Sequence, residues 1–242
     1  TVCTIEARMG SSRFPGKTLA PLYGRPMLER MIERLRRADR VDQIVVATTV
    51  DHDDDAIEEL CRSLNVGCFR GSIDDVLSRV LRAAIAFDAE LIVEMCGDCP
   101  LADPAVIDDA VNTFINGSYD YVSTFLEPGY PVGVNAQVFP TSVLAEVASL
   151  TDDPNDREHV SLYIYEHPQK YRLHHLAPSA QMNRPDVRLT VDTMEDLALI
   201  ERILERLYPV KPAFDTRDVI ALLDREPELL EVNAHVVQKS AR

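Results

Sequence analysis

The fold is decided by the stretch VCTIEARMGSSRFPGK, residues 2–17. Its first part, 2–6, is an apolar run that predicts a strand buried on both faces of a parallel sheet. The loop that follows, 7–17, holds two glycines, two serines, a proline and the cations Arg8, Arg13 and Lys17. Glycine lets backbone N–H groups approach phosphate oxygens, and cations offset their charge. The loop is therefore typical of a polyphosphate site, although an ordinary basic surface loop would have the same composition.

Helix and strand patterns alternate after this loop. The order predicts an α/β fold with a doubly wound, mostly parallel sheet and right-handed crossovers. In such a sheet a ligand lies beyond the carboxyl ends of the strands. Loop 7–17, loop 70–75 and the turn at Gly97-Asp98 should meet there. The expected strands are 43–49, 66–69 and 91–96, and the expected helices begin near Pro26 and span 56–64, 74–87 and 104–114.

The pattern changes after residue 120. We expect one domain over 1–242, with an inserted α+β cap at about 120–185 that binds the acceptor of a transferred group or a second subunit. The later strands are expected at 121–125, 134–139, 171–176 and 188–191, and the later helices at 157–166, 195–207 and 216–224.

Composition narrows the possible partners. The net charge of −15 without a basic tail argues against nucleic acid. No apolar run approaches the roughly 20 residues of a membrane span. Five cysteines are an odd number, and Cys96-Gly-Asp-Cys99 lacks a second pair for zinc, so we expect reduced thiols and a cytoplasmic protein. In so acidic a chain, three cations in one loop indicate a local positive site.

Two acids follow predicted strands directly. Asp98 comes after the strand at 91–96, and Asp192 after the one at 188–191. Carboxylates at strand ends opposite a phosphate loop are where a Mg²⁺ ligand is needed. Each acid could instead cap a helix, although Asp103 and Thr193 are placed to do so. The acid run 51–55 is better explained as a favourable helix start than as a metal site.

Five blocks of sequence resemble the cytidylyltransferase family in that family's order. This family activates acidic keto-sugars as CMP conjugates, and the similarity is greatest to the branch typified by spore-coat polysaccharide biosynthesis protein F. The resemblance implies a nucleotide-diphospho-sugar transferase-like, Rossmann-like fold. The blocks are 7–17 with 24–28, 70–79, 97–101, 157–165 and 188–197.

The resemblance also implies roles for individual residues. Catalysis would rest on Arg13, Lys17 and Asp98, with Arg13 and Lys17 holding the triphosphate. Magnesium would bind Asp98 and Asp192. The remaining positions are Ala7, Arg8, Gly10, Ser12, Gly71, Ser72 and Arg79 for the nucleotide, and Asn135, Gln137, Arg157, Glu158 and His159 for the acceptor.

The implied activity is Mg²⁺-dependent transfer of CMP from CTP to an acidic sugar, with release of pyrophosphate, in surface polysaccharide biosynthesis. A homodimer is implied as well. A glycosyltransferase of similar fold is one alternative, but it would normally carry Asp-x-Asp where this chain has Asp98-Cys-Pro. A non-catalytic nucleotide-binding member of the family is the other.

The chain departs from the branch on the expected acceptor side. Glu94-Met95-Cys96 replaces an Arg-hydrophobe-Thr pattern, and Asn135 and Gln137 stand where the branch has two acids. We hypothesise that the neutral amides tolerate a more anionic acceptor.

Overall fold

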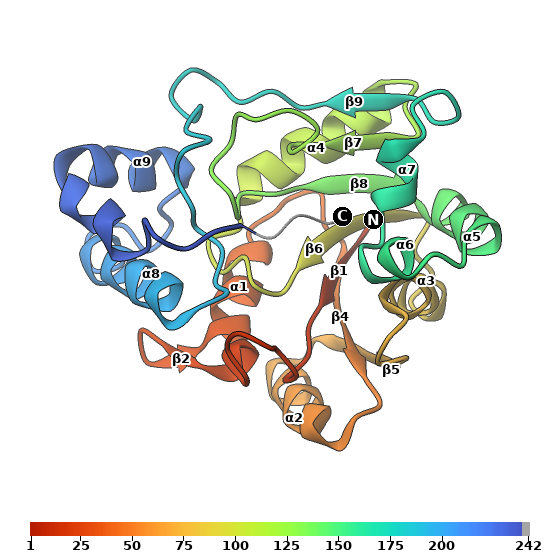
Figure 1. Ribbon diagram of the computed structural model, residues 1–242, viewed down its shortest axis with the longest axis horizontal. Helices are drawn as coiled ribbons and strands as arrows, with labels where there is room; N and C mark the ends of the chain where they lie inside the picture. Colours follow the sequence, from red (N-terminus) through yellow and green to blue (C-terminus); the bar gives the residue numbers. More distant parts are fainter. Residues whose placement is uncertain (239–242) are drawn as a thin grey trace.

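The computed structural model describes residues 1–238. These residues form a seven-stranded sheet covered by helices (Figure 1). The strand order is β5-β4-β1-β6-β8-β7-β9. The first four strands are mutually parallel, β8 is antiparallel to both its neighbours, and β9 is parallel to β7. The strands are β1 (Val2–Glu6), β4 (Gln43–Thr49), β5 (Gly67–Gly71), β6 (Leu91–Cys96), β7 (Tyr121–Ser123), β8 (Gln137–Pro140) and β9 (Leu173–His175).

Helices cover both faces of this sheet, because each parallel crossover must return over one face. Residues of α1, α2, α4, α8 and α9 share one hydrophobic core, and residues of α3, α5 and α7 share a second core. The predicted doubly wound α/β fold is thus confirmed. The helices are α1 (Met27–Leu35), α2 (Asp55–Leu64), α3 (Val76–Ala86), α4 (Pro104–Asn116), α5 (Thr141–Leu150), α6 (Pro154–Glu158), α7 (Leu162–Glu166), α8 (Met194–Leu207) and α9 (Thr216–Arg225). Shorter elements are the hairpin β2 (Pro21–Leu22) and β3 (Arg25–Pro26), and the 3-10 turns η1 (Lys17–Leu19), η2 (His52–Asp54) and η3 (Pro227–Val232).

Segment 120–185 does not form a sheet of its own. Its strands β7, β8 and β9 lengthen the main sheet beside β6. The segment also contains α5, which the sequence analysis left out. The helix expected at 157–166 is two short helices, because Asp153 caps an earlier start at Pro154 and His159 leaves the helical conformation. Glu158 and His159, which lie at this break, line a cleft at the carboxyl ends of β1 and β6.

The prediction of a strand at 188–191 is wrong. Only one parallel bridge forms there, between Val132 and Arg188. Gly133 follows with φ +101°, and a Cβ on it would lie 2.6 Å from the backbone nitrogen of Thr190, so the ladder ends at once. Segment 188–191 is instead held by the turn at Gly97-Asp98, because the N–H of Val191 donates to the carbonyl of Asp98 at 2.8 Å. This contact brings the two predicted metal ligands together.

No helix among residues 1–238 has the length and apolar character needed to cross a bilayer.

Candidate active site

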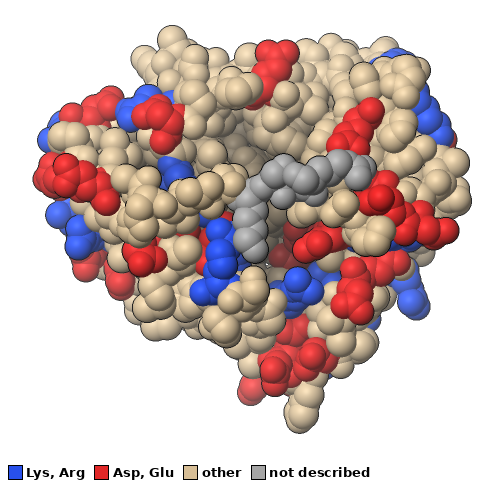
Figure 2. All heavy atoms as spheres, viewed as in Figure 1, with Lys and Arg blue, Asp and Glu red and all other residues tan. Residues whose placement is uncertain are grey.

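A cleft of about 740 Å³ opens at the carboxyl ends of β1 and β6. Lys and Arg side chains gather beside the central hollow in Figure 2. Gly97 permits the tight turn at its base: its N–H donates to the carbonyl of Glu6 at 2.9 Å, and a Cβ would lie 2.7 Å from that oxygen. Of the predicted site residues, those that line the cleft are Ala7, Arg8, Gly10, Ser12, Arg13, Lys17, Arg79, Asp98, Asn135, Glu158, His159 and Asp192.

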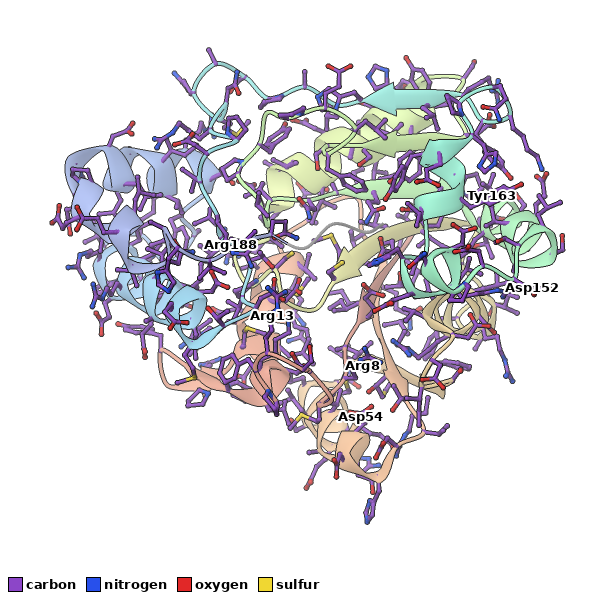
Figure 3. All side chains as sticks on the ribbon, in the orientation of Figure 1. Arg8, Arg13, Asp54, Asp152, Tyr163 and Arg188 are labelled. Carbon is purple, nitrogen blue, oxygen red and sulfur yellow. The ribbon has the colours of Figure 1, made fainter. Side chains whose placement is uncertain are left out.

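Loop 7–17 is fixed by a buried carboxylate that the sequence analysis did not single out. Asp54 accepts from the N–H of Met9 at 2.7 Å, and its other oxygen accepts from the backbone and hydroxyl of Thr49. Thr18 adds a hydrogen bond to the carbonyl of Arg8 at 2.7 Å. Figure 3 shows Asp54 beside Arg8. Asp54, the last acid before α2, therefore holds loop 7–17 in place.

Lys17 joins Asp98 and Asp192, the two acids that the sequence predicted as metal ligands. Its ammonium donates to Asp98 Oδ2 at 3.0 Å, to Asp192 Oδ1 at 2.9 Å and to the carbonyl of Val191 at 2.8 Å. Burial works against a charged lysine, but the two carboxylates outweigh it and raise the pKa of Lys17. The three donors are all used, so the lysine is a fixed positive charge at neutral pH.

Asp192 is held by two further cations. Arg13 lies 2.9 Å and Arg188 2.7 Å from its Oδ2 (Figure 3). Burial opposes ionisation, yet these cations and Lys17 lower the pKa of Asp192. Helix α8 is capped by Thr193 and Asp196, so Asp192 is free to face the cleft. Arg188 also binds the buried Asp196 at 3.0 Å, and this anchor went unnoticed in the sequence.

Asp98 and Asp192 have the donor set of a divalent hard cation. One small cationic group, the Lys17 ammonium, already contacts an oxygen of each. Oxygen-only ligands with room for phosphate oxygens suit Mg²⁺ better than a thiophilic metal. Asp103, the rival to Asp98 as a helix cap, does cap α4 by accepting from the N–H of Ala105 at 3.0 Å. The residues present fit the magnesium that the sequence implied.

The predicted base segment approaches the cleft indirectly. Arg79 donates to the carbonyl of Ser72 at 2.6 Å, and Arg8 donates to that of Ile73 at 3.3 Å. Gly71 and Ser72 themselves lie outside the cleft lining. The two arginines therefore connect segment 71–73 to the nucleotide loop.

The predicted acceptor residues divide into two groups. Asn135, Glu158 and His159 line the cleft. Arg157 is turned away, because its guanidinium donates to the carbonyls of Thr151 at 3.0 Å and Ala148 at 2.8 Å. Its contacts position α6 against the end of α5 rather than face a ligand.

Gln137 is buried behind the cleft, in a chain of hydrogen bonds. Its carbonyl accepts from Tyr121 at 2.7 Å and from Ser161, and its amide donates to Glu94 Oε2. The Gln137 side chain therefore has partners at both its oxygen and its nitrogen and lies outside the cleft lining.

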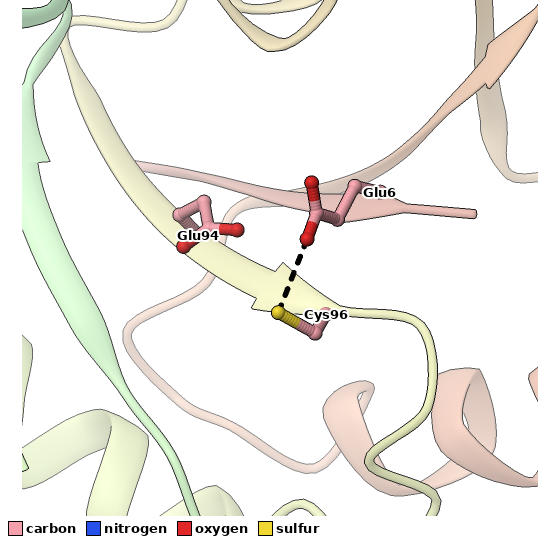
Figure 4. Close-up of side chains that lie close together, drawn as sticks. All are labelled: Glu6, Glu94 and Cys96. Carbon is pink, nitrogen blue, oxygen red and sulfur yellow. Dashed lines mark hydrogen bonds between the residues drawn. The ribbon is translucent and has the colours of Figure 1, made fainter. Parts of the chain in front are cut away.

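Glu6, Glu94 and Cys96 form an acidic floor to the cleft (Figure 4). One side-chain ligand atom from each lies within 4.8 Å of the others, and the Cys96 thiol donates to Glu6 at 3.1 Å. Glu6 and Cys96 line the cleft, and Glu94 is buried behind them. Burial raises the pKa of Glu6, and burial with the charges of Glu6 and Asp98 raises that of Glu94 well above its usual range.

Comparison with known proteins gives one family. The family described as Cytidylyltransferase matches residues 2–220. Spore coat polysaccharide biosynthesis protein SpsF of Bacillus subtilis is 32% identical over 93% of this chain and 94% of its own. Two further relatives are each 30% identical: 8-amino-3,8-dideoxy-manno-octulosonate cytidylyltransferase of Shewanella halifaxensis (89% of this chain, 91% of its own) and 3-deoxy-manno-octulosonate cytidylyltransferase of Geotalea daltonii (86% and 87%).

A solved structure agrees with this result. A cytidylyltransferase from Leptospira borgpetersenii serovar Hardjo-bovis superposes with a TM-score of 0.90 at 29% identity, covering 99% of both chains.

Proposed function

This chain belongs to the cytidylyltransferase family, and from that premise we propose that it transfers CMP from CTP to a sugar acid, with Mg²⁺ as cofactor and pyrophosphate as the second product. The family and the nucleotidyltransferase class were both expected from the sequence and are confirmed. The sugar acid is proposed because two relatives are named for octulosonate acceptors.

One observation carries the proposal. Arg13 and Lys17 of the glycine-containing loop meet Asp98 and Asp192 at one point of the cleft, with contacts of 2.9–3.0 Å. Cations would hold the triphosphate, and the carboxylates would hold the magnesium that accompanies it. A site for neutral ligands has no need of this combination.

The reaction forms one bond and breaks one at the α-phosphorus of CTP. An acceptor oxygen attacks, and the bond to the β-phosphate oxygen breaks as pyrophosphate leaves. Negative charge grows on the phosphate oxygens, where Arg13 and Lys17 offset it. Because loop 7–17 is anchored by Asp54, these charges are in place before the reaction and little reorganisation is required.

Asp98 and Asp192 would hold the magnesium, with Arg188 fixing the orientation of Asp192. When bound, Mg²⁺ would supply positive charge to the triphosphate and would favour release of the acceptor hydroxyl proton to solvent.

The acceptor would enter beside Asn135, Glu158 and His159, which face the nucleotide loop across the cleft. We assign acceptor binding, or contact with a second subunit of a homodimer, to segment 120–185. In this proposal the enzyme works in the cytoplasm and supplies an activated sugar for surface polysaccharide.

Pyrophosphate release tests the proposal. CTP, MgCl₂ and a panel of sugar acids are incubated with the purified protein, and release is followed with a coupled phosphate assay. We expect release with CTP and at least one sugar acid. Tight CTP binding without release for any acceptor would favour a non-catalytic family member, and turnover of a nucleotide sugar instead would indicate a glycosyltransferase.

A further inference from the structure

Glu6 and Cys96 of the acidic floor line the cleft, and Glu94 lies buried directly behind them. We propose that Glu6 and Glu94 bind an ammonium group of the acceptor, so that the enzyme selects an amino-substituted sugar acid over its hydroxyl counterpart. This inference rests on the proposed function and specifies its substrate class.

The spacing of the two carboxyls suits one nitrogen. Their oxygens lie within 4.8 Å of each other. A nitrogen between them would be within normal N–H···O reach of both, since two such bonds of about 2.8 Å span up to about 5.6 Å. The same cleft shows this arrangement in Lys17, whose ammonium lies 3.0 Å from Asp98 and 2.9 Å from Asp192.

The floor lacks a cation of its own. Among the described residues 1–238, no Lys or Arg forms an ion pair with Glu6 or Glu94, although three cations contact Asp192. The positive charges of Arg79 and Arg8 act on Glu6 from a distance and work to lower its pKa. Both guanidinium groups donate instead to backbone carbonyls of 72–73. An acceptor ammonium would supply the missing charge, whereas a carboxylate placed there would be repelled.

Two polar groups beside Glu94, the Thr4 hydroxyl and the Gln137 amide, are consistent with a cationic ligand. Thr4 pairs in register with Glu94 and shares its face of the sheet, and its buried hydroxyl has no hydrogen-bond partner. The Gln137 amide is already used by Glu94, so it does not open space for an anion. The hypothesis that Asn135 and Gln137 tolerate a more anionic acceptor stays a prediction, and the present proposal predicts the opposite preference.

The test compares matched acceptors. kcat/KM is measured with CTP and pairs of sugar acids that differ only in carrying –NH₃⁺ or –OH at one carbon, for example 8-amino-3,8-dideoxy- and 3-deoxy-manno-octulosonate. We expect the amino acceptor of at least one pair to be preferred about tenfold or more, as charge-assisted hydrogen bonds allow. Glu94→Gln and Glu6→Gln should each reduce this ratio toward one.

Two variants make the result specific. Glu90→Gln removes an exposed carboxylate just before β6, away from the cleft, and should keep the ratio. The exchange Glu94→Arg with Gln137→Glu keeps a complementary pair at the observed contact, and it should reverse the preference while thermal unfolding shows that the fold persists.

Each other outcome overturns the inference. Equal kcat/KM for the amino and hydroxyl acceptors of every pair would do so and leave the proposed function intact. Co²⁺ binding with a thiolate absorption band that Cys96→Ser removes would assign the floor to a metal instead. Absence of pyrophosphate from every acceptor would overturn the proposed function and this inference with it.

Discussion

Two pairs of carboxyl groups lie at the same cleft, with Glu94 buried behind its lining, and they differ in what surrounds them. Asp98 and Asp192 are bridged by Lys17, and Asp192 also contacts Arg13 and Arg188. Glu6 and Glu94 have a thiol and an amide as their hydrogen-bond donors. The first pair contacts Arg13 and Lys17 of loop 7–17, and the second pair lies at the carboxyl-terminal halves of β1 and β6.

The difference shows in the pKa values. Cations lower the pKa of Asp192 despite its burial, whereas burial raises the pKa of Glu94. A carboxylate such as Asp192, whose charge is favoured by fixed cations, suits a site for a metal and a triphosphate. A pair that forms no ion pair with Lys or Arg among the described residues suits a ligand that brings its own positive charge. Four variants, taken in order of expected effect, would break or sharpen this contrast.

Asp98→Asn should have the largest effect. It removes a charged ligand atom from the first pair with almost no change in shape, and we expect kcat to fall about a thousandfold in the pyrophosphate assay. The exposed Asp109→Asn in α4 is the matched control and should keep activity. Retained turnover in Asp98→Asn, with an unchanged unfolding temperature, would remove Asp98 from the site.

Lys17→Met should lower kcat/KM for CTP about a hundredfold, because it removes a fixed charge from the triphosphate site. Lys211→Met loses a single exposed contact with Asp218 and should behave like the wild type. An unchanged KM and kcat in Lys17→Met would show that the loop does not hold the triphosphate.

Arg188→Met tests the anchor of the first pair. The Mg²⁺ concentration for half-maximal rate should rise about tenfold, as for other residues that orient metal ligands. The buried Asp196 also loses a partner, so the free energy of unfolding should fall by about 2 kcal/mol. Arg172→Met, at an exposed pair with Asp120, should change neither quantity. A metal requirement equal to the wild type would assign Arg188 a purely structural role.

Apart from its effect on acceptor preference, Glu94→Gln should change how stability depends on pH, and this is the smallest of the four expected effects. A raised pKa in the folded state means that the folded protein holds the Glu94 proton more tightly than the unfolded chain. Its contribution is therefore complete below the unfolded glutamate pKa of about 4.3 and is lost as the pH rises through the folded value.

Gln does not titrate, so it loses no stability through this proton. The free energy of unfolding of the variant, measured with urea, should therefore rise relative to that of the wild type as the pH increases from about 4 to about 8. Glu6, Asp98 and Gln137, the groups that interact with Glu94, are unchanged in the comparison. A pH-independent difference between the two proteins would show that Glu94 is not protonated preferentially in the folded state.

Local patterns were enough to predict much of this site. The strand, loop and cations of 2–17 are contiguous, and Asp98 and Asp192 each follow an apolar run, so topology alone brings them together. Asp54 was missed because it acts across the chain, on Met9 45 positions away. Arg188 is close in sequence to Asp192, but its contact depends on the irregular backbone of 188–192, which the expected strand did not provide.

The errors have physical causes as well. The apolar run at 188–191 is buried in the core, but Gly133 of its neighbour ends the pairing after one bridge, so no strand forms. Glu94 and Gln137 were noticed only as separate departures. Their pairing depends on the antiparallel register of β6 and β8, which apolar periodicity does not specify.

A crystal structure with CTP and Mg²⁺ tests the account most directly. We predict electron density for the metal between Asp98 and Asp192, for the triphosphate against Arg13 and Lys17, and none for a metal at Glu6 and Glu94. A metal bound by Glu6, Glu94 and Cys96, or a nucleotide outside the cleft of loop 7–17, would contradict it.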